Sequence, residues 1–282
     1  MTVPGQEAPG QAASKPVAGA RGKRSGVLSR FIEANKRFCK QKLQPLLYPV
    51  SHMTALDTWF DRRVNRLPAE AALLEFGCGR TFRLTHLLGE RFAVRFATDI
   101  EDVPSAATPP GVSFKRCTPD VIPFENEQFD IVVIRSVLEH VDDPARTFAE
   151  LARVTKPGGR VLLNLPNKWD YVSVLARAAG RYKSSILKNL VMTGWEDFPV
   201  RYRCNTRRSF TRCAHGAGFA VEQFLPLPSQ PSYLSFFVPF YMMGAAYQFL
   251  VGFFGFDALQ PSFVVILRRI GPPSDEWGRG TP

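Results

Sequence analysis

Two glycines and a later carboxylate have the types and spacing of a nucleoside-binding site. Residues 71–76 form a short run, apolar except for Glu75, that leads into Gly77, Cys78 and Gly79. Glycines at such a turn let the backbone approach a ligand that a side chain would exclude, and the N-terminus of the next helix points at that ligand. Asp99 follows Gly79 by 20 residues, where a carboxylate can accept hydrogen bonds from ribose hydroxyls. The spacing therefore favours a nucleoside cofactor over a tight turn without a ligand.

The residues around the loop favour one nucleoside over another. The third glycine of a dinucleotide fingerprint is missing, because Arg80, Thr81 and Phe82 follow Gly79. An acid, Glu75, precedes the first glycine instead. A pyrophosphate would be repelled there, whereas a carboxylate supports the cationic amino-acid end of S-adenosylmethionine. The loop thus indicates S-adenosylmethionine rather than NAD.

The elements that must position these residues alternate between strands and helices. The run at 130–134 is continuously apolar after its first residue, as a parallel strand buried on both faces requires. Strands are expected at 71–76, 93–98, 112–117, 130–134, 160–165, 220–225 and 262–270, and helices at 80–88, 144–154 and 207–217. A turn is expected at 157–159. This alternation predicts an α/β fold with a doubly wound parallel sheet.

Several ordered motifs give the chain a family resemblance. The stretches IPF and QFDIVV (122–133), SVLEHVDDP (136–144) and ELARVTKPGGR (150–160) resemble the class I S-adenosylmethionine-dependent methyltransferases. Within that class they are most similar to the small-molecule branch with the ubiquinone and menaquinone methyltransferases. The resemblance implies a Rossmann-like fold with a seven-stranded, mostly parallel sheet and a final antiparallel strand. N-terminal helices and an apolar helical insertion before the last strand would be added to it.

The resemblance also implies roles for individual residues. Glu75, Gly77, Cys78 and Gly79 would form the loop at the methionine end of the cofactor, Asp99 would hold the ribose, and Ile100 would stack beside the adenine. Cys117, Thr118 and Pro119 stand where the family commonly has an acid facing the adenine amino group, so Asp120 or Thr118 is expected to make that contact. Arg135, Ser136 and His140 follow the fourth strand and are expected to face both cofactor and acceptor.

His140 has two interpretations. Methyl transfer needs alignment, and it needs proton removal when the acceptor is a hydroxyl. A histidine titrates near neutral pH, so His140 is the candidate catalytic base. The alternative is that His140 orients its loop by bonding to backbone. Glu139 is expected to be a solvated or loop-stabilising carboxylate rather than a catalyst.

The chain divides into a central domain with appended segments. We expect a disordered basic tail at 1–26, N-terminal amphipathic helices at 27–67, the methyltransferase domain at 68–270 with insertions at 167–205 and 227–260, and a flexible tail at 271–282. The first helix is expected to close near Pro45. The second, at 54–67, is expected to begin with Thr54 and Asp57 in capping-box spacing.

The net charge of +11 belongs to the flanks. It divides into +8 for residues 1–66, −3 for 67–166 and +6 for 167–282. Residues 223–256 carry no charge. A single transmembrane span there would separate the last strand from its sheet, so we expect apolar helices that roof the substrate site or dip into one leaflet. A buried helical insertion is the alternative.

A basic stretch at 177–212 suggests three kinds of surface. Nine Lys/Arg (Arg177, Arg181, Lys183, Lys188, Arg201, Arg203, Arg207, Arg208 and Arg212) alternate with Trp195, Phe198, Tyr202 and Phe210. Such a surface can bind RNA, an anionic membrane or only water. The neighbouring uncharged segment favours the membrane and makes nucleic acid the weaker choice.

The remaining residue types point to a reducing compartment. The five cysteines and four histidines lack disulfide or metal-ligand spacing, and no secretory signal precedes residue 27. We therefore expect a cytoplasmic methyltransferase, peripheral to a membrane, without a metal, that acts on a small apolar or lipid-like acceptor. A non-catalytic, membrane-associated scaffold of the same fold and an RNA methyltransferase are the alternatives. The sequence leaves open the oligomeric state and whether oxygen, nitrogen or carbon is methylated.

Overall fold

The computed structural model describes residues 26–88, 91–171, 173–174 and 199–271. The tails expected at 1–26 and 271–282 therefore lie outside the described residues, except for Gly26 and Gly271. So do Trp195, Phe198 and four of the nine basic residues of the 177–212 stretch (Arg177, Arg181, Lys183 and Lys188).

Seven strands form one sheet in the order β3-β2-β1-β4-β5-β7-β6. The strands are β1 Ala72–Phe76, β2 Val94–Asp99, β3 Val112–Arg116, β4 Phe129–Arg135, β5 Thr155–Pro166, β6 Phe219–Leu227 and β7 Ser262–Arg269. β1 to β5 pair in parallel, and β7 runs antiparallel to both β5 and β6. The Rossmann-like methyltransferase sheet with an antiparallel last strand is thus confirmed.

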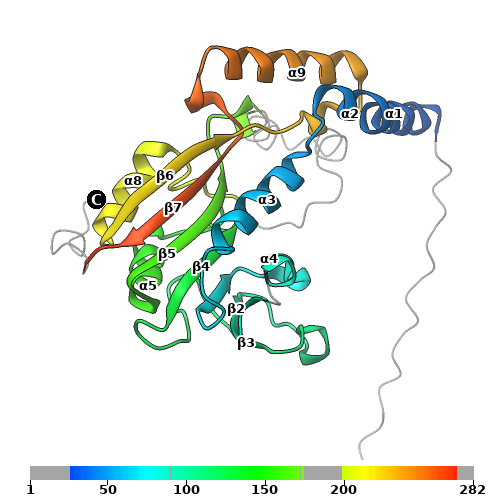
Figure 1. Cartoon of the computed structure of the whole chain (residues 1–282). Helices are drawn as coiled ribbons and strands as arrows, with labels where there is room; N and C mark the ends of the chain where they lie inside the picture. Colours follow the sequence, from blue (N-terminus) through cyan, green and yellow to red (C-terminus); the bar gives the residue numbers. More distant parts are fainter. Residues whose placement is uncertain (1–25, 89–90, 172, 175–198, 272–282) are drawn as a thin grey trace, which may run out of the picture.

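Helices cover both faces of the sheet and one of its ends (Figure 1). α3 (His52–Val64) and α4 (Arg83–Leu88) lie on one face, and α5 (Pro144–Val154) and α8 (Arg207–Gly216) on the other. α9 (Val238–Phe253) lies across the top, beside α1 (Val27–Phe38) and α2 (Gln44–Leu47). The short helical turns are η1 Cys39–Leu43, η2 Gly79–Thr81, η4 Ser105–Ala107, η5 Ser232–Leu234 and η6 Asp257–Leu259.

Consecutive apolar residues in the central strands build two cores. Successive side chains of a strand point to opposite faces. Leu73 packs with α3 and α4, whereas its neighbour Leu74 packs with α5 and α8. Val133 and Ile134 of β4 divide in the same way. A strand buried on both faces therefore needs the continuous apolar runs that the sequence shows.

The N-terminal helices differ from the expectation in two details. Ser51 caps α3 by accepting a hydrogen bond from Thr54 N at 3.1 Å, so the Thr54–Asp57 capping box is wrong. The first helical stretch ends at Leu47, near Pro45 as expected, but it is interrupted by the π-helical turn η1. Proline has no N–H and clashes with the preceding turn, and a wider π turn directly before it accommodates both effects.

Two other local expectations need correction. The helix expected at 80–88 is divided at Phe82, which has a left-handed φ of 45°, into η2 and α4. The turn expected at 157–159 is an irregularity inside β5, which begins at Thr155. A Cβ on Gly159 would lie 2.8 Å from the Lys156 carbonyl oxygen, so the bend closes tightly on itself.

Candidate active site

The glycine loop after β1, residues 77–79, has left-handed backbone angles at both glycines, which a residue with a side chain adopts only with strain. Gly77 has a φ of +78° and Gly79 a φ of +55°. A Cβ on Gly77 would lie 2.2 Å from Val137 Cγ2, whereas a Cβ on Gly79 would meet nothing within 4 Å. Gly77 N donates to the Thr98 carbonyl oxygen at 2.8 Å, which ties the loop to the end of β2. Gly77 therefore serves the fold of the loop, and Gly79 leaves open space beside it.

Asp99 at the end of β2 holds the same loop from the other side. Its Oδ2 accepts from Gly79 N at 2.7 Å, and its Oδ1 accepts from Glu101 N at 3.0 Å. A carboxylate has about four lone-pair sites, so both oxygens retain acceptor capacity for a ligand. Glu101 in turn pairs with Arg80 at 2.9 Å, at the rim of the site.

A cleft of about 250 Å³ opens above these residues, at the carboxyl ends of β1, β2 and β4. Six of the predicted cofactor and catalytic residues line it, each at the end of a strand or within five residues after one: Gly77, Gly79, Asp99, Ile100, Ser136 and His140. Cys117 and Pro119 also line the cleft, whereas Thr118 and Asp120 are exposed and do not. The cleft thus contains the position of the expected adenine contact but not the two side chains chosen for it.

Two predicted loop residues point away from the cleft. Glu75 is 3% exposed and accepts hydrogen bonds from Leu84 N, Thr85 N and Thr85 Oγ1, so it caps the start of α4. Burial raises the pKa of Glu75, and the hydrogen bonds to Thr85 and Leu84 act in the opposite direction. The Cys78 side chain is buried in a small core with Phe82.

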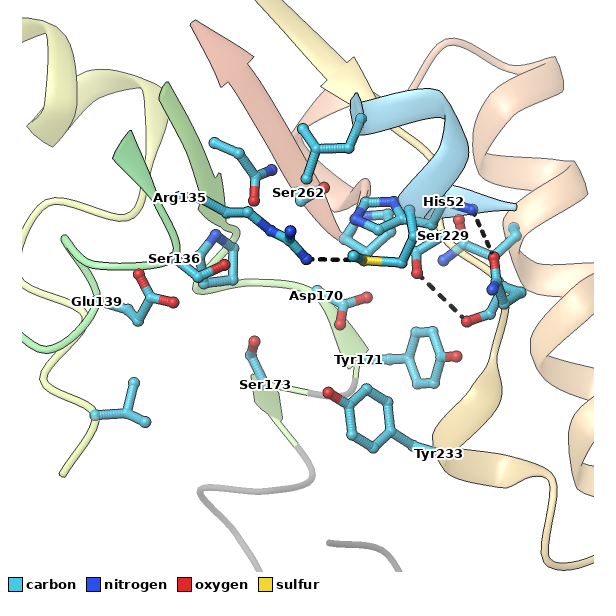
Figure 2. Close-up of a pocket in the computed structure, with 18 of the residues that line it drawn as sticks. His52, Arg135, Ser136, Glu139, Asp170, Tyr171, Ser173, Ser229, Tyr233 and Ser262 are labelled. Carbon is cyan, nitrogen blue, oxygen red and sulfur yellow. Dashed lines mark hydrogen bonds between the residues drawn. The ribbon is translucent and has the colours of Figure 1, made fainter. Parts of the chain in front are cut away.

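A larger cavity of about 500 Å³ adjoins the cleft at Ser136, which lines both. Ser136 has a left-handed φ of 52°, and strained backbone of this kind is common at ligand sites. Arg135 lines the larger cavity and not the cleft, and its Nη2 donates to Met53 Sδ at 3.0 Å. Figure 2 shows Arg135, Ser136 and Glu139 on one side of this cavity and Tyr171 and Tyr233 on the other.

The walls of the larger cavity come from segments far apart in the sequence. α3 contributes His52, Met53 and Leu56, the 166–173 segment contributes Asp170 and Tyr171, and α9 contributes Gln248. The sequence analysis named none of these residues as site residues. The uncharged 223–256 segment was the available signal, since we expected it to roof the substrate site.

His140 and Glu139 occupy different spaces. His140 lines the cofactor cleft, and its Nδ1 lies 3.2 Å from the Pro199 carbonyl oxygen. Burial lowers the pKa of His140. Glu139 lines the larger cavity, is 5% exposed, and its carboxylate approaches His140 Nε2 at 3.9 Å. Of the two expectations for Glu139, a solvated or a loop-stabilising carboxylate, its burial shows that the first is wrong.

The basic stretch has a different character from the one expected. Phe210 is fully buried in the core beside Phe148, and Tyr202 lines the larger cavity. Of the aromatic residues of this stretch that the structure describes, Phe210 is thus unavailable for stacking on a base. The five described arginines of the stretch are exposed: Arg201, Arg203, Arg207, Arg208 and Arg212.

The geometry fits S-adenosylmethionine. The glycine loop leaves room beside Gly79, Asp99 has free acceptor capacity at the edge of the cleft, and the cleft opens at Ser136 into a second cavity for an acceptor. A nucleoside site at the carboxyl ends of β1 and β2 beside a second cavity, in a 3-2-1-4-5-7-6 sheet, defines a class I S-adenosylmethionine-dependent methyltransferase.

Comparison with known proteins agrees with this class. Residues 50–223 match the family described as "Methyltransferase domain", and the chain belongs to that family. It is 29% identical over 181 residues to the ubiquinone biosynthesis O-methyltransferase of Pseudomonas fluorescens (strain SBW25), covering 61% of this chain and 74% of that protein. It is 30% identical over 185 residues to the enzyme of the same name from Pseudomonas syringae pv. tomato, with the same coverage.

Solved structures share the fold at lower identity. Geranyl diphosphate C-methyltransferase from Streptomyces coelicolor A3(2), in complex with Mg²⁺, geranyl diphosphate and S-adenosyl-L-homocysteine, superposes with a TM-score of 0.51. It is 14% identical, over 77% of this chain and 79% of that chain. The protein is thus an S-adenosylmethionine-dependent small-molecule methyltransferase.

Proposed function

We propose that this enzyme methylates a hydroxyl oxygen of a small, apolar or lipid-like acceptor that it receives at an anionic membrane surface. The observation that carries the proposal is the position of α9. Gln248 on the buried face of this helix lines the larger cavity, which we take as the acceptor cavity, and large apolar side chains of the same helix are exposed on its outer face. The name of the Pseudomonas relatives supports oxygen as the methylated atom.

The described residues suggest how the cofactor is held. Asp99 would accept hydrogen bonds from the ribose, and Ile100, Cys117 and Pro119 would border the adenine. When bound, S-adenosylmethionine supplies an electrophilic methyl group on a sulfonium. Arg135 lines the larger cavity next to Ser136, the residue that lines both spaces, and makes no ion pair among the described residues, so it is suited to a carboxylate at the methionine end. Its nearest carboxylates are already engaged, since Asp57 pairs with Arg83 and Glu75 caps α4.

The buried face of α9 supports the roofing role. Tyr241, Gly244, Gln248 and Val251 are buried at helical spacing, and Gln248 lines the cavity. A Cβ on Gly244 would lie 2.7 Å from Pro231 Cβ, so this glycine allows α9 to approach the turn η5 closely.

The outer face of α9 continues into the N-terminal helices. Val238 N donates to Asn35 Oδ1 at 3.2 Å, and Tyr241 of α9 and Cys39 of η1 are each 1% exposed. Large apolar side chains at least two-fifths exposed gather on these elements: Val27, Leu28, Phe31, Phe38, Leu46, Phe240, Met242, Met243, Phe249, Leu250, Phe253, Phe254 and Phe256. We name them the apolar surface. Exposed apolar side chains gathered on neighbouring elements are typical of an interaction site, and aromatic residues are suited to a bilayer interface.

Charges beside the apolar surface favour a bilayer as its occupant. Arg30, Arg37, Lys40 and Lys42 are exposed on α1 and η1. Each basic residue near an anionic bilayer contributes about 1 kcal/mol of attraction. No helix among the described residues has the length and apolarity to cross a membrane. The arrangement supports binding to one leaflet, from which an apolar acceptor can enter the cavity below α9.

Sedimentation with vesicles tests the membrane part of the proposal. We expect the protein to pellet with phosphatidylcholine vesicles that contain phosphatidylglycerol, less with pure phosphatidylcholine, and less as salt rises. Protein that stays in the supernatant with both kinds of vesicle would refute it.

The acceptor part of the proposal is tested by methylation of phenols with and without a prenyl or alkyl chain, with the methylated atom identified by NMR. Methylation of nitrogen or carbon alone would refute the assignment of oxygen.

A further inference from the structure

The acceptor cavity contains a buried carboxylate that the cofactor site does not use. Glu139 follows the SVL segment after β4, is 5% exposed, and lines the cavity. Its Oε2 is buried and has no hydrogen-bond partner among the residues that the structure describes. A buried carboxylate oxygen without a partner is costly, and such groups are retained where a ligand completes their bonding.

The backbone around Glu139 is fixed. Its carbonyl oxygen accepts from Arg201 N at 2.6 Å and from Tyr202 N at 3.1 Å, which attaches the 199–202 segment to this position. His140 reinforces the attachment through the Pro199 carbonyl oxygen. The Glu139 side chain is therefore presented to the cavity from a rigid support, as a group that acts on a substrate requires.

We propose that Glu139, and not His140, accepts the proton of the reacting hydroxyl group. This rests on the proposed oxygen acceptor. The hydroxyl proton passes to the Glu139 carboxylate as a lone pair of the acceptor oxygen forms the bond to the methyl carbon. The C–S bond breaks with its electron pair remaining on sulfur, which becomes a neutral thioether. Glu139 then releases the proton to water, so each turnover yields one methyl ether and one proton.

The surroundings of Glu139 suit this role. Burial raises the pKa of Glu139 to about 8. A base near the operating pH is the efficient choice for a phenol, whose own pKa is about 10. The titratable and charged groups around Glu139 are His140 on its own loop, Cys204 on the segment that follows residues 199–202, and Arg135 and Asp170 in the lining of the same cavity. The cavity is also lined by four further titratable residues: His52, Tyr171, Tyr202 and Tyr233. His140 approaches from the cofactor side, and its pKa is lowered, so it is mainly neutral near pH 7.

Kinetics of Glu139→Gln, Glu139→Asp and His140→Gln test the proposal, with the exposed Glu125→Gln as a control that removes the same charge away from the cavity. The acceptor is a phenol that the wild type methylates on oxygen, so failure of the proposed function appears before any variant is compared. We expect Glu139→Gln to lower kcat about 10²–10⁴-fold with little change in KM. The wild-type kcat should rise with pH through about 8, and the rise should be absent in Glu139→Gln and partly restored in Glu139→Asp.

A second measurement does not depend on turnover. In protein labelled with ¹³C at the glutamate carboxyl carbons, the Glu139 resonance is the one lost in Glu139→Gln. We expect the phenol to shift this resonance and its titration in the absence of cofactor. Calorimetry should show unchanged S-adenosylmethionine affinity in Glu139→Gln, which separates loss of a base from loss of the fold. The proposal is overturned if Glu139→Gln keeps the wild-type kcat and pH profile, or if only His140→Gln abolishes the pH dependence of kcat. It is also overturned if the Glu139 resonance does not shift when the phenol is added.

Discussion

Asp99 Oδ2 accepts a hydrogen bond from Gly79 N at 2.7 Å, so the acid at the end of β2 and the glycine loop after β1 form one unit. The same carboxylate lines the cleft proposed for the nucleoside. Asp99 thus has a part in shaping the loop and a proposed part in holding the ribose. The two parts can be separated by experiment.

Asp99→Ala should abolish S-adenosylmethionine binding in isothermal titration calorimetry, because it removes both the acceptor for Gly79 and the ribose contact. Asp99→Asn keeps one side-chain oxygen and should bind with intermediate affinity. Each lost hydrogen bond to a charged group is worth about 1.5–3 kcal/mol. Unchanged affinity in Asp99→Ala would contradict the assignment of the cofactor site.

The two glycines of the loop should tolerate alanine differently. Both have a positive φ, which costs an alanine about 1–2 kcal/mol. Only Gly77→Ala also collides with Val137, so it should lower the melting temperature further and abolish cofactor binding. Gly79→Ala should remain folded with weaker binding. Equal melting temperatures for the two variants would show that the loop moves freely away from Val137.

Replacing Phe249, Phe253 and Phe254 with serine should release the protein from anionic vesicles. These side chains are 60–72% exposed, so the folded state loses little packing. The matched control is Ile270→Ser, which removes a side chain that is 62% exposed at the end of β7. Sedimentation with anionic vesicles should show reduced binding for the triple variant and unchanged binding for Ile270→Ser. An equal loss of vesicle binding in both variants would argue against the apolar surface as the membrane-binding site.

The basic residues beside the apolar surface should govern the salt dependence. Arg37, Lys40 and Lys42 replaced together with glutamine should weaken binding to phosphatidylglycerol vesicles by about 3 kcal/mol at most. The control replaces the exposed Arg203, Arg208 and Arg212, which lowers the net charge equally elsewhere. If both triple variants bind the vesicles equally weakly, the net charge of the protein, rather than the basic residues beside the apolar surface, accounts for the attraction to the membrane.

Gln248→Leu should separate stability from acceptor binding. Both polar atoms of the Gln248 side chain are buried and have no hydrogen-bond partner in the described part of the chain, although the residue lines the acceptor cavity. Replacing an unsatisfied buried amide with an apolar side chain of similar size is neutral or stabilising. We therefore expect an equal or higher melting temperature with a raised KM for the acceptor. A lower melting temperature with an unchanged KM would indicate a structural role.

The free energy of unfolding should decrease as the pH rises from about 4.5 to about 8. The folded protein keeps a proton on Glu139 over this range, because burial raises its pKa from 4.5 to about 8, whereas the unfolded chain has lost it. One such group contributes a slope of at most about 1.4 kcal/mol per pH unit. Urea unfolding at several pH values should show a flatter profile for Glu139→Gln. An identical slope in the variant would mean that Glu139 is not buried in its neutral form.

The sequence by itself determined the fold and the cofactor loop. Strands buried on both faces require continuous apolar runs, and the glycines and acids of the loop must stand at or just after the ends of particular strands. The central strands and the glycine loop can therefore be recognised from short stretches of consecutive residues. This is why the positions of Gly77, Gly79 and Asp99 were predictable. The helix cap at Ser51 and the π-helical turn before Pro45 were less predictable, because a cap depends on which side chain forms the hydrogen bond and a proline clash can be relieved in more than one way.

Only the tertiary structure decided which side chains face which cavity. Glu75 caps α4, Arg135 and Glu139 enter the larger cavity, and His140 enters the smaller one, although the last three lie within six positions of each other. The acceptor cavity joins α3, β4 and α9, and the folding of distant segments onto one sheet edge leaves no periodic trace in the sequence. Burial, which sets the charge of Glu139, is likewise a property of the assembled fold.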